Sequence, residues 1–279
     1  MQVVVYLLAV LAAGNSLRVE VTGNRQAPVY SAASIVNAAS NVVGALAPNT
    51  FATIYGTGLS YSTRAMAPED IRSGRLPTEL GGVRVLVGGT PAVLYYVSPG
   101  QVNLLIPTWK AMNWPDSEIQ VLADGKAGPA VSIKLLETAP ALFQWSETTV
   151  VATRPDWTPI TAAAPARPGD WVILFATGLG ETVPETIWGQ TPSAAAPLKR
   201  LSEFRVLLGD AVLEGHRGVF YTGAAPGLAG LYQINLKLPE QLGDDPEIRI
   251  ALGDQISPAG LRLPVRNPVA AQPTPLPMR

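Results

Sequence analysis

Four short segments of this chain occur twice, in the same order along the sequence. In the first pair, PNTFATIYGTGLS at 48–60 matches PGDWVILFATGLG at 168–180. The other pairs are 82–89 with 204–210, 101–107 with 233–239, and 119–125 with 248–254. Such a duplication predicts two copies of one structural unit. The offset between the copies grows from 120 residues for the first pair to 132 for the third, which indicates loop insertions in the second copy, notably around 222–230.

The repeated segments have the pattern of β-strands. Residues 233–238 read QINLKL, so apolar and polar side chains alternate, and Val83, Val85 and Val87 follow the same alternation. A period of two places one set of side chains on a buried face and the other set on the opposite face. Turn signals such as the Gly pair at 88–89 separate the runs. No window of a dozen residues has convincing helical periodicity.

The fold class predicted is all-β, with two tandem immunoglobulin-like β-sandwich domains. The Cys…Trp…Cys pattern of true immunoglobulin domains is absent, because the chain has no cysteine. We expect a signal peptide over 1–14, a lead-in segment over 15–31, a first β-sandwich module over 32–138, a second over 139–266 and a Pro-rich disordered tail over 267–279.

Composition argues against several classes of function. The formal net charge is −1 and no basic stripe is visible, so nucleic acid and anionic membranes are not expected as partners. The absence of cysteine excludes disulfides, thiolate metal sites and cysteine nucleophiles. His216 is the only histidine, and no G-x-S-x-G motif accompanies it. We therefore expect no enzyme activity, no catalytic or metal-binding residue and no cofactor.

An unbroken apolar run, Val3 through Ala13, stands near the N-terminus. It is too short for a transmembrane helix, which needs about 20 residues, but it has the length of a signal-peptide core. Ala12 and Gly14 suit a cleavage site after Gly14, although no Lys or Arg precedes the run. We expect a secreted or extracytoplasmic protein without a transmembrane segment. The alternative interpretation is a buried first strand.

Longer stretches of both halves resemble a known family. They are IVNAAS at 35–40, 47–59 and 76–107 in the first half, and 166–180 and 225–239 in the second. In combination they resemble the Solibacter-type uncharacterised C-terminal domain family, which is found at the ends of secreted bacterial proteins. The resemblance covers nearly the whole chain after the lead-in segment. It implies immunoglobulin-like sandwich modules outside the cytoplasm, and it supplies no catalytic residues.

Loop tryptophans are the leading candidates for contact with a ligand. Trp109 and Trp114 lie in the loop TWKAMNWPD, Trp145 and Trp157 flank the start of the second module, and Trp188 lies in a loop. Tryptophan rings can stack on sugar rings while an edge remains available for hydrogen bonds. They can also pack the seam between modules. Trp109 and Trp114 are the predicted ligand-binding residues.

Other motifs favour structural roles. Gly58 and Gly178 each end a strand, and we expect a positive φ there rather than a phosphate-binding loop. Carboxylates cluster at 69–70 and 244–247, where solvated turn charges are expected and a calcium site is the alternative. A pair of amides recurs in both copies, at Gln101, Asn103, Gln233 and Asn235. These amides face away from the core, where they can bond one another, cap a loop or line a polar binding face.

The function favoured by these features is that of a non-enzymatic extracytoplasmic module pair for adhesion, spacing or display. Its partner would be a cell-surface protein or a polysaccharide. One alternative is a carbohydrate-binding protein that uses Trp109 and Trp114. Others are a hydrolase with dispersed carboxylates and a homo-oligomeric surface-layer element joined through an exposed strand edge. The fold alone does not choose among them, because sandwiches host many functions.

Overall fold

A computed structural model describes residues 26–108, 116–215 and 217–267 of the chain. These residues form short strands joined by turns, and their helical elements are single 3-10 turns at Ala32–Ser34, Pro68–Asp70 and Leu201–Glu203. No helix in this part of the chain is long and apolar enough to cross a bilayer. The predictions for the signal peptide, Trp109, Trp114, His216 and most of the tail fall outside the described residues.

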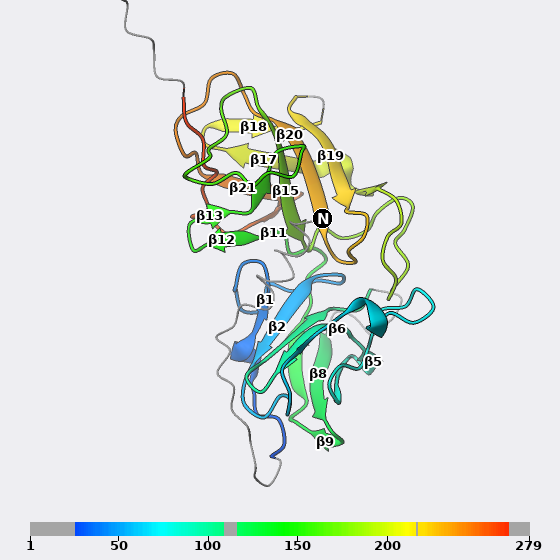
Figure 1. The fold of residues 1–279 in the computed structure, drawn as a ribbon. Helices are drawn as coiled ribbons and strands as arrows, with labels where there is room; N and C mark the ends of the chain where they lie inside the picture. The colour runs from blue at the N-terminus through cyan, green and yellow to red at the C-terminus, as the bar shows by residue number, and fades with distance from the viewer. Residues whose placement is uncertain (1–25, 109–115, 216, 268–279) are drawn as a thin grey trace, which may run out of the picture.

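The first module is a sandwich of two antiparallel sheets (Figure 1). One sheet has the order β1-β2-β7-β6-β3, formed by β1 (Ile35–Asn37), β2 (Phe51–Tyr55), β7 (Gln101–Leu105), β6 (Val93–Ser98) and β3 (Arg64–Ala65). The other has the order β10-β8-β4-β5, formed by β10 (Val131–Lys134), β8 (Asp116–Ala123), β4 (Val83–Val87) and β5 (Thr90–Pro91), with β9 (Lys126–Ala127) paired to β8.

The end of the expected lead-in segment is also part of this sandwich. Val29 pairs with Thr57, and the ring of Tyr30 lies in the core of the first module. The Tyr30 hydroxyl donates a hydrogen bond to the carbonyl of Pro129 (2.5 Å) and accepts one from the backbone N–H of Val121 (2.8 Å). This residue therefore joins the start of the chain to the second sheet.

The second module repeats this plan. Its first sheet has the order β11-β15-β20-β19-β16, formed by β11 (Ala141–Leu142), β15 (Trp171–Thr177), β20 (Tyr232–Lys237), β19 (Val219–Ala224) and β16 (Ala196–Pro197), with β14 (Ala152–Thr153) paired to β15. Its second sheet has the order β18-β17-β21-β22, formed by β18 (Ala211–Leu213), β17 (Phe204–Leu208), β21 (Ile248–Leu252) and β22 (Gln255–Ile256). A hairpin of β12 (Gln144–Ser146) and β13 (Thr149–Val150) completes the strands.

The four repeated segments become equivalent strands. β2, β4, β7 and β8 of the first module correspond to β15, β17, β20 and β21 of the second, and the pairings β2–β7 and β4–β8 recur as β15–β20 and β17–β21. The prediction of an all-β fold with two tandem immunoglobulin-like sandwiches is confirmed. Gly58 and Gly178 have φ values of 64° and 75°, as predicted for the ends of the equivalent strands β2 and β15.

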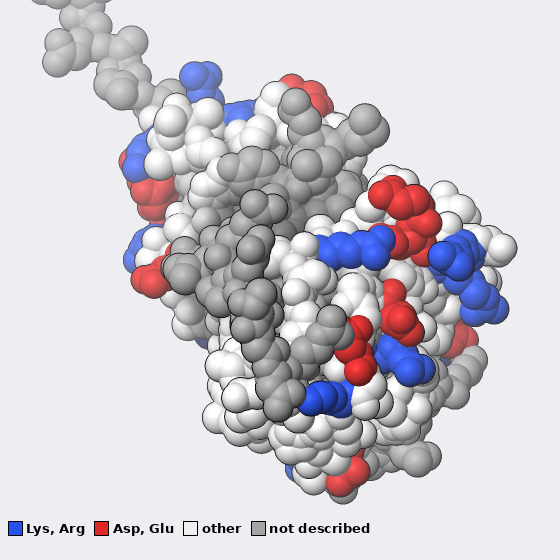
Figure 2. Space-filling model, turned by 60° about the horizontal axis from the view of Figure 1, so that its bottom comes forward, with Lys and Arg blue, Asp and Glu red and all other residues white. Residues whose placement is uncertain are grey.

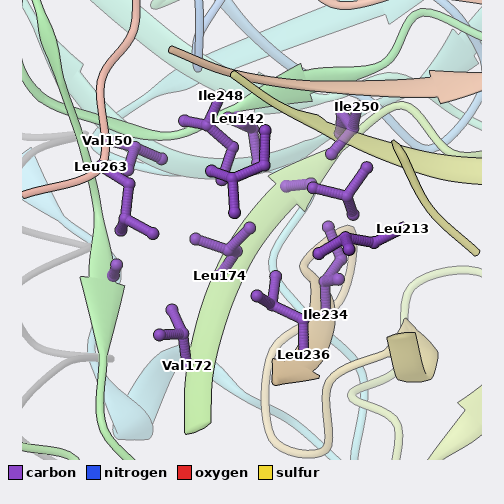
Figure 3. Packing of buried hydrophobic residues seen from close by; sticks show 14 of the residues in the cluster. Leu142, Val150, Val172, Leu174, Leu213, Ile234, Leu236, Ile248, Ile250 and Leu263 are labelled. Atoms are coloured by element: carbon purple, nitrogen blue, oxygen red, sulfur yellow. The ribbon is translucent and has the colours of Figure 1, made fainter. Parts of the chain in front are cut away.

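Each sandwich has its own core of inward-pointing apolar side chains. In the second module, Leu174 and Leu236 come from the first sheet and Ile248 and Ile250 from the second, and Figure 3 shows their side chains converging between the sheets. Every one of these four side chains is buried. Full burial of such a side chain contributes about 1.5–3 kcal/mol, so the alternating pattern supplies the main driving force for each module.

A third apolar cluster joins the two sandwiches. We call it the seam cluster, and its buried members are Ala39, Phe51, Leu76, Val93, Tyr95 and Leu105 from the first module and Ala141, Phe143, Val151, Ile173, Phe175, Ala225, Leu228, Ala229 and Leu231 from the second. The Phe51 ring lies at its centre, with its centroid 5.0 Å from that of Tyr95 and 6.0 Å from that of Phe143. The two modules are therefore packed against each other rather than merely tethered.

Hydrogen bonds across the seam fix how the modules meet. The backbone N–H of Phe51 donates to the hydroxyl oxygen of Thr177 (3.0 Å), and the Tyr95 hydroxyl donates to the carbonyl of Ala229 (3.0 Å). Tyr95 is fully buried, and this desolvation raises its pKa well above the usual range. The phenol therefore stays protonated and keeps its role as a donor.

Tyr232 adds a second link across the seam. Its hydroxyl accepts a hydrogen bond from Nδ2 of Asn49 (3.1 Å) and donates to the carbonyl of Gly180. Burial raises the pKa of Tyr232 to about 12, so this phenol also remains neutral and hydrogen-bonded at physiological pH.

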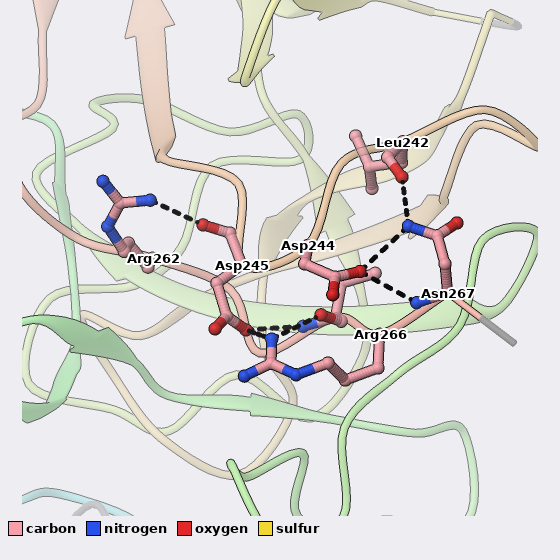
Figure 4. Close-up of polar contacts among 7 residues, drawn as sticks. Leu242, Asp244, Asp245, Arg262, Arg266 and Asn267 are labelled. Atoms are coloured by element: carbon pink, nitrogen blue, oxygen red, sulfur yellow. Dashed lines mark hydrogen bonds and ion pairs between the residues drawn. The ribbon is translucent and has the colours of Figure 1, made fainter. Parts of the chain in front are cut away.

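The predicted carboxylate cluster at 244–247 holds the last strand-like segment of the second module in place (Figure 4). One carboxylate oxygen of Asp244 accepts from both the backbone N–H and the side-chain amide of Asn267 (2.9 Å each). Asp245 pairs with Arg266, and its carbonyl accepts from Arg262 (2.8 Å). The structure thus gives these carboxylates hydrogen-bonding and ion-pairing roles. No group of three or more potential metal-ligating side chains is found in the described part of the chain.

Gly230 offers a test of seam packing. Its φ is +81°, and a Cβ there would lie 2.2 Å from Cδ1 of Leu105 across the seam. Gly227 has a similar φ of +90° with nothing within 4 Å of an added Cβ, so it is a matched control for backbone strain. We expect Gly230→Ala to lower the free energy of unfolding by about 1–3 kcal/mol more than Gly227→Ala, because only the former overpacks the seam. Urea denaturation measures both, and equal losses would contradict the seam packing.

Asp244 offers a test by titration. The hydrogen bonds from Asn267 hold the pKa of this carboxyl below its ordinary value of 3.8. A depressed pKa means that the contact stabilises the folded chain above pH 3.8 and is lost as the pH falls through the lower, folded value. We expect the NMR signal of the Asn267 amide to titrate with a midpoint below 3.8. A midpoint at or above that value would show that the contact does not form in solution.

Candidate functional site

The outer face of sheet β11-β15-β20-β19-β16 is the candidate site. Val172, Leu174 and Ala176 of β15 point into the core, so the alternation of the strand turns its other side chains outward. The outward side chains are Trp171, Ile173 and Phe175 on β15, Gln233, Asn235 and Lys237 on β20, and Phe220 and Tyr221 on β19. We call this surface the open face, although its Ile173 and Phe175 are buried in the seam cluster and only its Trp171 end is exposed.

Trp171 and Phe220 form an exposed aromatic pair on the open face. Their ring centroids are 4.6 Å apart at an interplanar angle of 54°, and the residues are 43% and 53% exposed. Trp171 starts β15 opposite Lys237, and a bulge between Val219 and Tyr221 turns Phe220 outward. The two rings therefore reach toward each other from the strands on either side of β20. Exposed apolar groups gathered in this way mark interaction surfaces more often than isolated exposed residues do.

The same aromatic pair occurs in the first module. Phe51 holds the position equivalent to Trp171, and Tyr95 lies in the equivalent bulge, between Leu94 and Tyr96. The rings of Phe51 and Tyr95 lie 5.0 Å apart at 58°, nearly the arrangement of the pair in the second module. Phe51 and Tyr95 are 0% and 2% exposed, because the second module covers them. The duplication has therefore produced one covered pair and one open pair.

A second aromatic contact lies at the other end of β15. Trp157 stacks on Phe175 with a centroid distance of 6.4 Å and an angle of 25°, and its indole remains partly exposed. Trp157 has a φ of +68°, which is costly for a bulky side chain. Asp156 stabilises this turn, because its carboxylate accepts from the Thr158 backbone (3.0 Å) and hydroxyl (2.7 Å). The Thr158 hydroxyl is the main cause that lowers the pKa of Asp156.

Amide side chains lie between the aromatic groups. Nε2 of Gln233 donates to Oδ1 of Asn235 (2.8 Å), and the equivalent Gln101 and Asn103 of the first module make the same contact (2.9 Å). The prediction that these amides face away from the core is confirmed, although each bond joins two residues of one strand. In the described structure, Nδ2 of Asn235 and Oε1 of Gln233 have no protein partner, so one donor and one acceptor are available to a ligand.

The predicted tryptophans separate into different environments. Trp157 lies beside the open face, Trp188 packs partly buried against the seam cluster, and Trp145 is exposed on the β12–β13 hairpin. Trp109 and Trp114 lie outside the described residues, so their predicted role stays a prediction. Trp171 was not among the sequence candidates, because it reads as the first residue of a strand. The sequence signal that could have identified Trp171 is its alignment with Phe51 in the repeat, where the second copy has the larger indole ring.

Two carboxylates, those of Glu137 and Glu181, line one cavity of about 480 Å³. It is the place in the described structure to test the alternative of a hydrolase with dispersed carboxylates. Lys199 lies 2.6 Å from Glu181, and Arg200 lies 3.3 Å from Glu137 and 2.6 Å from Glu203. A glycosidase needs one carboxyl that remains protonated in an apolar setting. Exposed, ion-paired carboxylates do not provide that setting, so this cavity favours ion pairing over catalysis.

The surface charge is mixed in sign. On the face shown in Figure 2, Lys and Arg side chains are interspersed with Asp and Glu, and no extended region of one sign is visible among the coloured residues. A nucleic acid requires several cations in a row along its phosphates. The open face, by contrast, carries aromatic rings, amides and Lys237, a set suited to an uncharged polar ligand with apolar patches.

Comparison with known proteins supports no assignment beyond the fold. No family model matches the chain, and no curated protein is significantly similar to it. Among solved structures it is similar to a surface glycan-binding protein from Prevotella bryantii (11% identity, TM-score 0.26), covering 85% of this chain and 42% of that one. It is also similar to the I9–I11 tandem of titin, at 10% identity and a TM-score of 0.24, covering 80% of this chain and 62% of that one. The tandem Ig repeats of Dlar match at 12% identity and a TM-score of 0.21, covering 80% of this chain and 92% of that one. These superpositions are loose, and the fold class rests on strand topology.

Equivalent substitutions should have unequal effects on stability. We expect Phe51→Ala to lower the free energy of unfolding by about 3–5 kcal/mol, because it empties the centre of the seam cluster. Trp171→Ala at the equivalent exposed position should cost no more than about 1 kcal/mol. Urea denaturation of both variants gives the comparison. A large loss for Trp171→Ala would mean that this ring serves the fold rather than a ligand.

Proposed function

We propose that this chain is a non-enzymatic, extracytoplasmic binding protein that holds a polysaccharide on the open face of its second module. The observation that carries the proposal is the contrast between the two aromatic pairs. Phe51 and Tyr95 are buried by the neighbouring module, whereas Trp171 and Phe220 keep about half of their surface in solvent. The first module shows that an aromatic pair at this position can be buried by a neighbouring module. The second pair is not buried in this way, so it is accessible to a partner.

The chemistry of the open face matches that of a sugar chain. A pyranose ring presents C–H groups on its faces and hydroxyls at its edge. The C–H groups can lie against the electron-rich faces of Trp171 and Phe220, where aromatic packing excludes water. Meanwhile Nδ2 of Asn235 and Oε1 of Gln233 can bond the hydroxyls, as donor and acceptor respectively.

The exposed part of the face is short. Ile173 and Phe175 of β15 are buried in the seam cluster, so a ligand would contact Trp171, Phe220 and the neighbouring amides. Because this surface does not enclose the ligand, we expect a Kd between roughly 1 µM and 1 mM.

Two observations support the setting and the mode of action. The N-terminal apolar run has the length of a signal-peptide core. The packed seam also makes the two modules a rigid spacer, which suits adhesion or display at a surface. Binding on such a scaffold needs no bond chemistry, because the strands alone position the contacting side chains.

A protein partner is the second candidate, and the covered pair favours it. In the first module, the rings of Phe51 and Tyr95 dock the loop Ala225–Leu231 of the second. The open pair could accept a similar loop from another protein. Two replacements weaken this alternative: Lys237 stands where the first module has Leu105, and Phe220 lacks the hydroxyl that Tyr95 donates to Ala229. The open face is thus more polar and has lost one seam hydrogen bond.

The test is a glycan array followed by affinity electrophoresis in gels that contain the polysaccharides found. We expect a Trp171→Ala, Phe220→Ala double variant to bind at least about tenfold more weakly than the unaltered protein, a loss of about 1.4 kcal/mol. Trp145→Ala is the matched control, because Trp145 is 41% exposed on a different part of the module. Unchanged binding by the double variant, or an equal loss in the control, would overturn the proposal. Trp171-dependent capture of a protein without any glycan binding would favour the second candidate instead.

A further inference from the structure

A tight turn in the first module presents two arginines side by side. Arg72 and Arg75 are paired as partners in an antiparallel bridge, with backbone hydrogen bonds of 3.0 and 2.9 Å in both directions. Ser73 and Gly74 between them have φ values of 52° and 73°, as a two-residue hairpin turn requires. Residues directly opposite in such a pair extend their side chains from the same side of the turn. Both arginines are exposed and line one cleft.

Two positive charges directly opposite each other across the turn lower the stability of the fold. Opposite residues of one charge sign destabilise a strand pair. In the second module, a comparable turn places Glu214 opposite Arg217, so the charges there have opposite signs. The Arg72–Arg75 arrangement therefore has a cost that folding alone does not explain.

The acidic side chains of the cleft are already paired with other arginines. Asp70 contacts Arg64 and accepts a hydrogen bond from the backbone of Ala67 (2.9 Å). Glu79 lies 3.5 Å from Arg84. Among the described residues, no carboxylate forms an ion pair with Arg72 or Arg75. Within the described structure, two guanidinium groups thus have no ion-pair partner, on a chain whose formal net charge is −1.

The cleft is built from both modules, with a volume of about 690 Å³. Trp188 and Gly189 of the second module line it together with the two arginines. The backbone N–H of Leu76 donates to the carbonyl of Gly189 (2.8 Å), and Arg75 forms a bridge with Gln190. These contacts hold the backbone of the arginine turn against the tryptophan loop, so both arginines and the indole line the same cleft.

We propose that Arg72 and Arg75 bind the anionic groups, carboxylate or sulfate, of an acidic polysaccharide. The guanidinium fork matches the two oxygens of such a group with parallel N–H donors, which makes arginine better suited to this task than lysine. Trp188 on the wall of the cleft supplies an apolar contact for the sugar that carries the group. Two free cations are too few to hold a nucleic acid by its phosphates. This site does not depend on the open face and does not require it to bind.

The experiment is affinity electrophoresis of the whole chain in three gels, containing polygalacturonate, dextran sulfate or neutral dextran. We expect retardation by at least one of the two anionic polymers and none by neutral dextran. An Arg72→Gln, Arg75→Gln double variant should lose most of this retardation, whereas Arg217→Gln, from the comparable turn of the second module, should keep it. Retardation by polygalacturonate alone assigns carboxylate as the preferred group, and by dextran sulfate alone assigns sulfate.

Several outcomes would overturn the proposal. These are equal mobility of the double variant and the unaltered protein, an equal loss in Arg217→Gln, or no retardation in either anionic gel. Thermal unfolding at low salt controls for damage to the fold, and the double variant should be at least as stable because a like-charge repulsion has been removed. The Trp171→Ala, Phe220→Ala variant should keep its retardation by the anionic polymer, so failure at one site is distinguishable from failure at the other.

Discussion

The packing of Phe51 against the second module is the contact on which the molecule's organisation depends. Two sandwiches on a flexible connection would be independent binding units, and the outer faces of both sheets in each sandwich would be exposed to water. The seam cluster instead buries one end of the first module's sheet. Tyr95 lies within the cluster and Tyr232 beside it, both as neutral hydrogen-bonded phenols. Every surface beyond the seam is therefore presented at a fixed position relative to the others, and the second module supplies Trp188 and Gly189 to the wall of the arginine cleft.

Duplication followed by divergence explains why the two candidate sites are so different. The same strands carry an aromatic pair in both modules, but the loop Ala225–Leu231 of the second module covers the first pair. This is the region where the repeat offset indicates an insertion. The first module has a short turn, Pro99-Gly100, at the equivalent place. One inserted loop thus closed one aromatic pair, while the other pair stayed open.

The strand pattern and its repeat could be predicted because they are local properties. Alternation in 233–238 fixes which side chains face the core, and the matched segments fix which strands are equivalent. Whether an outward side chain is covered is not local. Phe51 and Trp171 occupy the same repeat position, and only the three-dimensional placement of the other module distinguishes them. The arginine turn escaped notice for a similar reason, since its lack of a counter-charge depends on Arg64 and Arg84 engaging the nearby acids.

The construction of the cleft across the seam has a mechanical consequence. Arg72 and Arg75 belong to one module and Trp188 to the other, so a pulling force that peels the modules apart would take the indole away from the two arginines while each sandwich was still folded. The open face lies within a single sheet and would survive the same load. If both proposed sites hold polysaccharide, tension across the seam would weaken the grip on an acidic chain before the grip on a neutral one.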